Sequence, residues 1–232
     1  MEKTLEFLSD KVNTYVYLPS VIKNNYKNII KKYLEDIIQK YKIKGFVISN
    51  LSNLKFLEGY KSNFEIIGNS SLNIFNNYSI KECAEYGINK VTLSRELSKT
   101  ELEDILKYNL DIDTELIVYG TLPIMSCNYC FLGKSNMCYP ECKRLCSDDN
   151  SYYLKDRLGF KFRIVSDNIQ SITSIFNSKI LSISPKTFNV SSVRIDILDE
   201  NVTTINKIIE TVKSGKSFEG KEYTSGRLEE EK

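Results

Sequence analysis

The sequence contains no histidine. Histidine is the usual general base of enzymes and the commonest nitrogen ligand of metals in proteins. Its absence excludes Ser-His and Cys-His catalysis, and it excludes the HExxH motif of metalloproteases. Any chemistry in this chain must depend on other side chains.

Long apolar runs are missing as well. No run approaches the length that spans a bilayer, and the first residues, MEKTLEFLSDK, are charged throughout and lack the apolar core of an export signal. We therefore expect a cytoplasmic protein without membrane contact. In that compartment cysteines are kept reduced.

Glycine-rich phosphate-binding loops are a third absence. The chain has ten glycines, and neither a GxGxxG motif nor a Walker-type loop occurs in it. Such loops hold the phosphates of nucleotides in open α/β sheets. Their absence disfavours the nucleotide-binding versions of that fold.

The overall composition is that of an ordinary globular protein. Hydrophobic residues make up 41% and charged residues 27% of the 232 residues, which is enough for one sizeable core. The 32 basic and 30 acidic residues nearly balance. Net charge therefore gives no argument for attraction to nucleic acid or to anionic lipid.

Short apolar runs alternate with amphipathic stretches in the first half of the chain. Between residues 26 and 41, apolar and aromatic side chains recur at steps of three and four, as one helix face requires. The runs TYVYLP and FVIS on either side are typical of buried strands. Further strands are expected at 65–68, 90–93, 115–120 and 192–198.

The helix signals complete a repeated β/α pattern. Ser98 and Glu101 have the spacing of a capping box and predict a helix start before Leu102. Residues 205–212 carry an apolar helical face after the last strand. Six β/α repeats are visible, and the fold class is α/β. We favour an incomplete TIM-like (β/α) barrel over an open sheet, as one domain spanning 1–232.

An insertion at 126–190 interrupts this repeat. At about sixty residues it is far longer than an ordinary βα connection, and long connections usually carry function. Apolar and polar residues alternate around Leu158 and Gly159, which predicts a small hairpin. The remainder of the insertion is rich in cysteine.

Five of the six cysteines gather there with the pattern C-x2-C-x7-C-x3-C-x3-C. They are Cys127, Cys130, Cys138, Cys142 and Cys146. Such short spacings let thiolates converge on one metal centre, whereas unligated thiols in a hydrophilic loop would oxidise. The spacing predicts a metal site but leaves an iron-sulfur cluster and zinc both open. Cys83 lies apart on a helical pattern and is expected to be a small buried side chain.

Several further segments occur in a recognisable order. They are IKGFVISNL, GNSSLNIFN, VTLSREL, VYGTLPIM, the spacing of Cys130, Cys138 and Cys142, YYLKDRLG, IFNS, VRIDILDE and YTSG. Together these segments cover most of the chain. They resemble the peptidase U32 family, the collagenase-like family, and in particular the C-terminal barrel half of its longer bacterial members.

The resemblance implies a TIM-like barrel whose cysteines ligate an iron-sulfur cluster. It also implies two kinds of activity. Some members of the family are known as collagen-degrading peptidases. Others resemble oxygen-independent hydroxylation factors that act on transfer RNA, ribosomal RNA or a quinone precursor, with prephenate as a suggested oxygen source.

The chain departs from the family pattern in three respects. Ser171 stands where the family has a fourth cysteine, so Cys127 or Cys146 would have to replace that ligand. Asn69 stands where the family has an acidic residue before SLN. No counterpart of the N-terminal half of the longer members is present, which is compatible with a shortened paralogue, with a fragment, or with one partner of a pair whose other member supplies the missing half.

The strand ends supply the remaining candidates, because barrel enzymes place their chemistry at the carboxyl ends of the strands. The nearest polar residues are Asn50, Asn73, Glu96 and Tyr119. Each could instead cap a helix or pair with backbone.

Three functions remain open. The first is an iron-sulfur protein that supports hydroxylation or modification of RNA or a small precursor. The second is a collagenase-like peptidase that uses metal-activated water. The third is a non-catalytic, metal-binding partner subunit.

Overall fold

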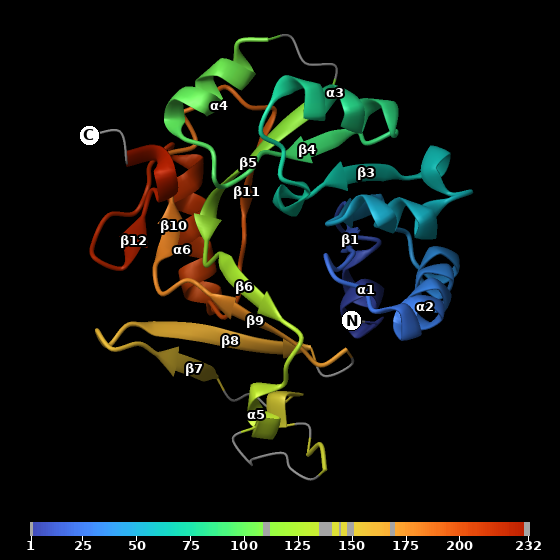
Figure 1. Cartoon of the computed structure of the whole chain (residues 1–232). Coiled ribbons are helices and arrows are strands. Elements are labelled where there is room, and N and C mark those ends of the chain that lie inside the picture. The colour runs from blue at the N-terminus through green and yellow to red at the C-terminus, as the bar shows by residue number, and fades with distance from the viewer. Residues whose placement is uncertain are drawn as a thin grey trace. The chain divides into compact units, whose positions relative to one another are not determined.

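A computed structural model describes residues 2–108, 112–134, 141–143, 145–147, 151–167 and 170–229 (Figure 1). The chain divides into two compact units. Unit 1 comprises Met1–Ile117, Thr187–Arg194 and Gly226–Lys232. Unit 2 comprises Val118–Lys186 and Ile195–Ser225.

Five parallel strands form the sheet of unit 1. They are β1 (Tyr15–Tyr17), β2 (Gly45–Ile48), β3 (Glu65–Gly68), β4 (Lys90–Thr92) and β5 (Asp113–Gly120), whose last residues belong to unit 2. Each strand pairs with the next in chain order, and every pairing is parallel. The parallel order predicted for these strands is therefore confirmed.

Helices connect most of these strands. They are α2 (Lys27–Lys40) after β1, α3 (Asn77–Glu85) after β3 and α4 (Lys99–Leu106) after β4, whereas α1 (Glu2–Leu8) precedes β1. The predicted capping box is present at α4, where Ser98 and Glu101 cap each other. Short 3-10 helices accompany them: η1 (Asn24–Tyr26), η4 (Ser70–Leu72) and η6 (Gly226–Glu229).

The connection between β2 and β3 holds no α-helix. It consists of two 3-10 helices, η2 (Leu51–Leu57) and η3 (Lys61–Asn63). Gly59, with φ at +89°, separates them. A left-handed residue ends a helix, and glycine adopts that conformation without steric cost. This stretch is long enough for one helix, but the glycine divides it.

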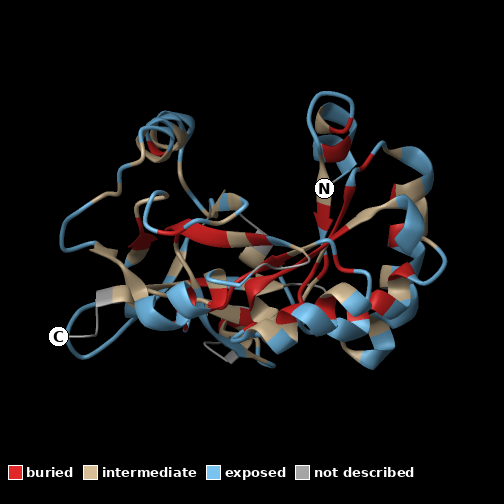
Figure 2. Cartoon of the chain, turned by 90° about the horizontal axis from the view of Figure 1, so that it is seen from above, coloured by how far each residue is buried: buried red, intermediate tan, exposed pale blue. Residues whose placement is uncertain are grey.

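One face of the parallel sheet forms the core of unit 1. Phe46, Ile48, Ile66 and Val91 are completely buried, and the strand register places them on the same face. The buried residues, red in Figure 2, follow the strands. Helices α2, α3 and α4 each contribute buried side chains such as Leu34, Ile80 and Leu102.

The other face of the same strands is partly polar. Tyr15 and Glu65 lie in one row across β1, β2 and β3, and the Tyr15 hydroxyl donates to the Glu65 carboxylate at 2.6 Å. Lys44 lies 3.1 Å from the same carboxylate. The hydrogen bond from Tyr15 lowers the pKa of Glu65, with the ammonium of Lys44 acting in the same direction.

Strand β11 (Ser192–Ile195) pairs with β5. The Thr114 amide donates to Ser191 Oγ, and the Asp196 amide donates to the Tyr119 carbonyl. Both segments advance in the same direction between these two bonds, so β11 is parallel to β5. It covers the first four residues of the strand expected at 192–198. Closure of the strands into a barrel stays a prediction. The structure establishes a mixed α/β fold with a largely parallel sheet.

One part of unit 2 is built on the end of β5. The end of β5 pairs with β10 (Ile180–Ser182) in antiparallel fashion, and β10 pairs with β12 (Tyr223–Thr224) in parallel. Helix α6 (Val202–Lys213) occupies the segment for which a helical face was predicted.

The insertion forms an antiparallel sheet of four strands in unit 2. Its order is β6 (Pro123–Cys127), β9 (Ile172–Phe176), β8 (Lys161–Asp167) and β7 (Tyr152–Lys155). The predicted hairpin is the β7–β8 pair, and it turns at Gly159, with φ at +91°. The sheet is larger than the predicted hairpin, because β9 pairs with β8 and β6 pairs with β9. Helix α5 (Phe131–Lys134) and η5 (Leu145–Ser147) lie in the cysteine-rich part.

None of the helices in the described ranges is long and apolar enough to cross a membrane.

Candidate functional site

Four of the five clustered cysteines lie in the described part of the chain. Cys127 ends β6, and its thiol donates to the Thr173 carbonyl at 3.5 Å. Cys130 is half-buried just before α5, Cys142 is exposed, and Cys146 is half-buried in η5. Cys138 lies outside the described residues.

All the described cysteines are free of disulfides. Among the described residues, no group of three or more Cys, Asp or Glu side chains is arranged to hold a metal ion. Since Cys138 is a central member of the predicted ligand set, the metal centre stays a prediction.

Ser171 lies in a turn, and Cys83 lies buried in a helix. Ser171 is exposed in the turn before β9 and has a left-handed backbone with φ at +55°. Cys83 lies in α3 and is 4% exposed, and burial raises the pKa of its thiol. A buried thiol with a raised pKa is a small apolar side chain, as expected for Cys83.

Two of the four polar candidates at the strand ends have local backbone roles, and a third contacts a distant residue through its backbone. Asn50 caps η2, where it accepts from the Ser52 amide at 2.9 Å. Asn73 has φ at +54° and ends η4. Glu96 is exposed, and its carbonyl accepts from Arg227 Nη1 at 2.8 Å.

Tyr119, the fourth candidate, is a buried aromatic residue of unit 2. Its ring is 2% exposed and meets the Phe218 ring edge-on at 5.7 Å. Burial, with the nearby charge of Glu200, raises the pKa of Tyr119 to about 12. The hydroxyl is therefore protonated at neutral pH and unsuited to act as a base.

A polar network that sequence reasoning missed lies on the polar face of the unit 1 sheet. Its centre is Arg194 of β11, whose Nη1 donates to Asn69 Oδ1 at 2.9 Å. The same Nη1 is 3.9 Å from Oε1 of Glu115 on β5. We use the name strand-end network for Arg194, Asn69 and Glu115 together with their hydrogen-bond partners Tyr17, Ser49, Ser71 and Thr92.

Strand geometry brings these side chains together. Asn69 directly follows β3, and its amide nitrogen lies 3.2 to 3.3 Å from the hydroxyls of Tyr17, Ser49 and Ser71. Thr92 and Glu115 are register partners on β4 and β5, and the Thr92 hydroxyl donates to the Glu115 carboxylate at 2.9 Å. Successive parallel strands thus end at one polar surface.

The comparison with protein families matches residues 1–197 to peptidase family U32. The chain belongs to peptidase family U32. Among solved structures, a match is described as the U32 peptidase Mk0906, with 8% sequence identity and a TM-score of 0.40. The match covers 52% of this chain and 51% of that chain. The comparison with curated proteins finds no match.

The network shows where this U32 chain departs from the pattern that the resemblance implied. At the position before SLN, for which the resemblance implied an acidic residue, the neutral Asn69 accepts a hydrogen bond from the Arg194 guanidinium. The Arg194 guanidinium also lies 3.9 Å from the Glu115 carboxylate, which is longer than a close ion pair. The side chain of Arg194 is 24% exposed, so it is partly accessible to solvent.

Proposed function

We propose that this U32 protein binds an iron-sulfur cluster through its cysteine segment and takes part in oxygen-independent hydroxylation or related modification of RNA or a small precursor. The spacing of the five cysteines supports the cluster, with zinc as the alternative metal. The resemblance to members of the family that act as oxygen-independent hydroxylation factors supports the proposed reaction.

The strand-end network is the observation that carries the reaction type. A partly exposed arginine at the carboxyl ends of parallel strands is a site for a ligand carboxylate, because the planar guanidinium binds carboxylates through two hydrogen bonds. An oxygen donor such as prephenate carries two carboxylates. Arg194 would bind one of them, and Asn69 would orient the guanidinium without neutralising it.

Titration calorimetry with prephenate tests this assignment. Replacing Arg194 by Gln removes the charge and should weaken binding at least about tenfold, the equivalent of ~1.4 kcal/mol. Replacing Arg194 by Lys keeps the charge but loses the two-bond geometry, so an intermediate affinity is expected. Arg157→Gln is the matched control because Arg157 is exposed in the hairpin turn of unit 2. Equal affinity in Arg194→Gln and wild type would refute the assignment.

The non-catalytic partner is the second candidate. The observation that favours it is the amide at position 69, since it leaves the polar surface with fewer ionisable groups than the family pattern implies. A wild-type protein that retains metal but does not bind prephenate would support this candidate over the first.

A further inference from the structure

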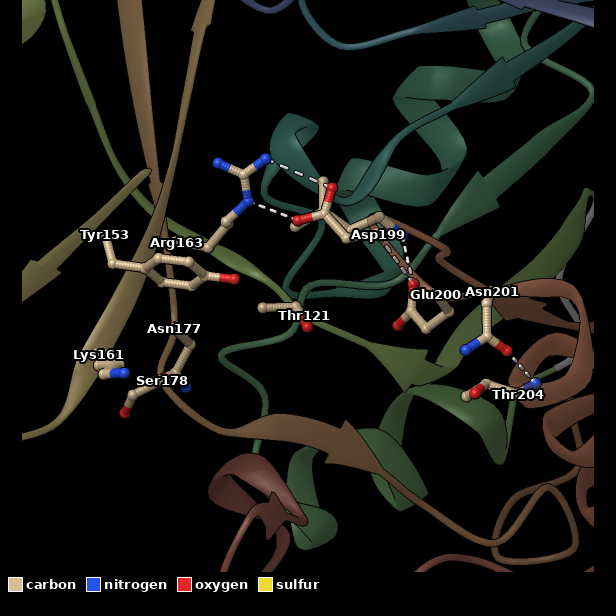
Figure 3. Close-up of a pocket in the computed structure, with 11 residues that line it drawn as sticks. Thr121, Tyr153, Lys161, Arg163, Asn177, Ser178, Asp199, Glu200, Asn201 and Thr204 are labelled. Carbon is tan, nitrogen blue, oxygen red and sulfur yellow. Dashed lines mark hydrogen bonds and ion pairs between the residues drawn. The ribbon is translucent and has the colours of Figure 1, made fainter. Parts of the chain in front are cut away.

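A pocket in unit 2 belongs neither to the strand-end network nor to the cysteine segment. Its volume is ≈ 390 Å³, which lies in the range of small-molecule sites. Figure 3 shows the residues that line it. They come from β7, from β8, from the links that precede β6 and β10, from the loop that leads into α6 and from the first turn of α6.

One wall is fixed by a paired arginine. Arg163 Nε lies 2.5 Å from Asp199 Oδ2, and Nη2 lies 3.4 Å from Oδ1, so the pair has two contacts. The guanidinium also donates to the Tyr152 carbonyl and lies 5.7 Å from the centre of the Tyr153 ring. These contacts neutralise Arg163 and hold it, which makes it part of the wall.

Two charges of opposite sign remain in the lining. Lys161 is exposed on β8, and its ammonium has no ion-pair partner among the described residues. Glu200 uses only Oε2 within the loop, where it accepts from the amides of Leu198 and Asp199 at 2.7 and 3.1 Å. In the view of Figure 3, Lys161 and Ser178 lie at the left of the pocket and Glu200 and Asn201 lie at the right.

The balance of charge decides which ligands suit the pocket. Lys161 and Arg163 offset Asp199 and Glu200, so the lining has no formal net charge. A phosphate or another multiply charged anion would meet two carboxylates. The start of α6 does not compensate for this, because the Asn201 side chain already accepts from the Thr204 amide. Separated opposite charges suit a ligand that carries both signs.

We propose that this pocket binds a short zwitterion of the dipeptide type. The ligand carboxylate pairs with Lys161, and the ligand ammonium pairs with Glu200. Between them, Thr121, Asn177 and Ser178 offer hydroxyl and amide groups to the peptide link, and the half-exposed Tyr153 ring offers an apolar surface. This inference does not depend on the proposed function, since it uses no residue of the strand-end network and no clustered cysteine.

Binding of alanyl-alanine to the full chain, followed by NMR titration, tests the proposal. The N-acetylated form lacks the ammonium and the C-terminal amide lacks the carboxylate, so each should bind about tenfold more weakly than the free dipeptide, or worse. Lys161→Met should weaken the free and N-acetylated forms and leave the amide unchanged. Glu200→Gln should weaken the free and amidated forms and leave the N-acetylated form unchanged.

Matched controls remove one charge without touching the pocket. Lys155→Met removes the register partner of Lys161 on the neighbouring strand, and Glu219→Gln removes an exposed carboxylate of the same unit. Both should bind the free dipeptide as wild type does. Absence of alanyl-alanine binding to wild type would overturn the proposal. Equal binding of the free and capped forms would also overturn it, and would favour an uncharged polar ligand such as a sugar.

Discussion

Tyr119 illustrates how burial changes the meaning of a polar residue. Its position near a strand end predicted a hydroxyl in the site, but its ring lies in an aromatic group with Phe218. Phe218 stacks in turn on Tyr223 at 5.4 Å. Sequence reasoning can locate a strand end, but which neighbours enclose a side chain depends on segments far away in the chain.

The raised pKa of Tyr119 has a consequence for stability at alkaline pH. The folded value of about 12 exceeds the ordinary value of 10.0, so the unfolded chain releases this proton first as pH rises. The stabilising contribution of the buried hydroxyl is complete below pH 10 and is lost between pH 10 and 12. At pH 11 the loss is roughly 1 kcal/mol.

Urea unfolding at pH 8 and pH 11 measures this effect. Tyr119→Phe should lose about 1 kcal/mol less free energy of unfolding between these pH values than wild type does. Tyr78→Phe is the control, because Tyr78 is 86% exposed and should behave as wild type. The same pH dependence in Tyr119→Phe and wild type would contradict the assigned protonation.

The strand-end network depends on contacts between distant residues, which residue patterns do not predict. The amide of Asn69 could be located from the segment before SLN, but its partner Arg194 lies 125 residues further along the chain. The bond depends on β11 lying beside β5, which no local pattern specifies. The segment VRIDILDE contains Arg194, so its alternation predicted the strand but not its neighbour.

At the scale of elements, local patterns predicted most of the parallel strands. Runs such as FVIS are short, apolar and β-branched, and β2 forms at that run, with Phe46 and Ile48 buried. The sequence predicted strands less well where their partner strands lie far away in the chain. Cys127 of β6 pairs with Thr173 of β9, so the sheet of the insertion could not be derived from the hairpin alone.

Pairing with β9 also fixes the position of Cys127, which bears on the ligand that replaces Ser171. A strand end held by register is a better fixed ligand position than the three-residue 3-10 helix η5, which carries Cys146, so Cys127→Ser should reduce iron per chain more than Cys146→Ser. Iron analysis after anaerobic purification compares the single and double mutants. Cys83→Ala is the control, because its buried thiol should not affect the iron content. Undiminished iron in the double mutant would leave a site without either cysteine as the simpler account.

At the scale of the whole molecule, the sequence suggested one domain, and the structure divides into two compact units. The division falls within β5, where the regular β/α repeat of unit 1 gives way to the insertion in unit 2. The strand-end network belongs to unit 1, and the cysteine segment belongs to unit 2. Family membership covers residues 1–197 and thus includes most of both units.

Iron and acid-labile sulfide per chain, measured after purification without oxygen, test the central claim most directly. The account predicts a brown protein with matching iron and sulfide, and loss of most of both in Cys138→Ser and in Cys142→Ser, because each change removes one thiolate from the cluster. A colourless protein that contains zinc, or no metal at all, would contradict the iron-sulfur assignment. Full retention of iron in both mutants would show that the ligands lie elsewhere.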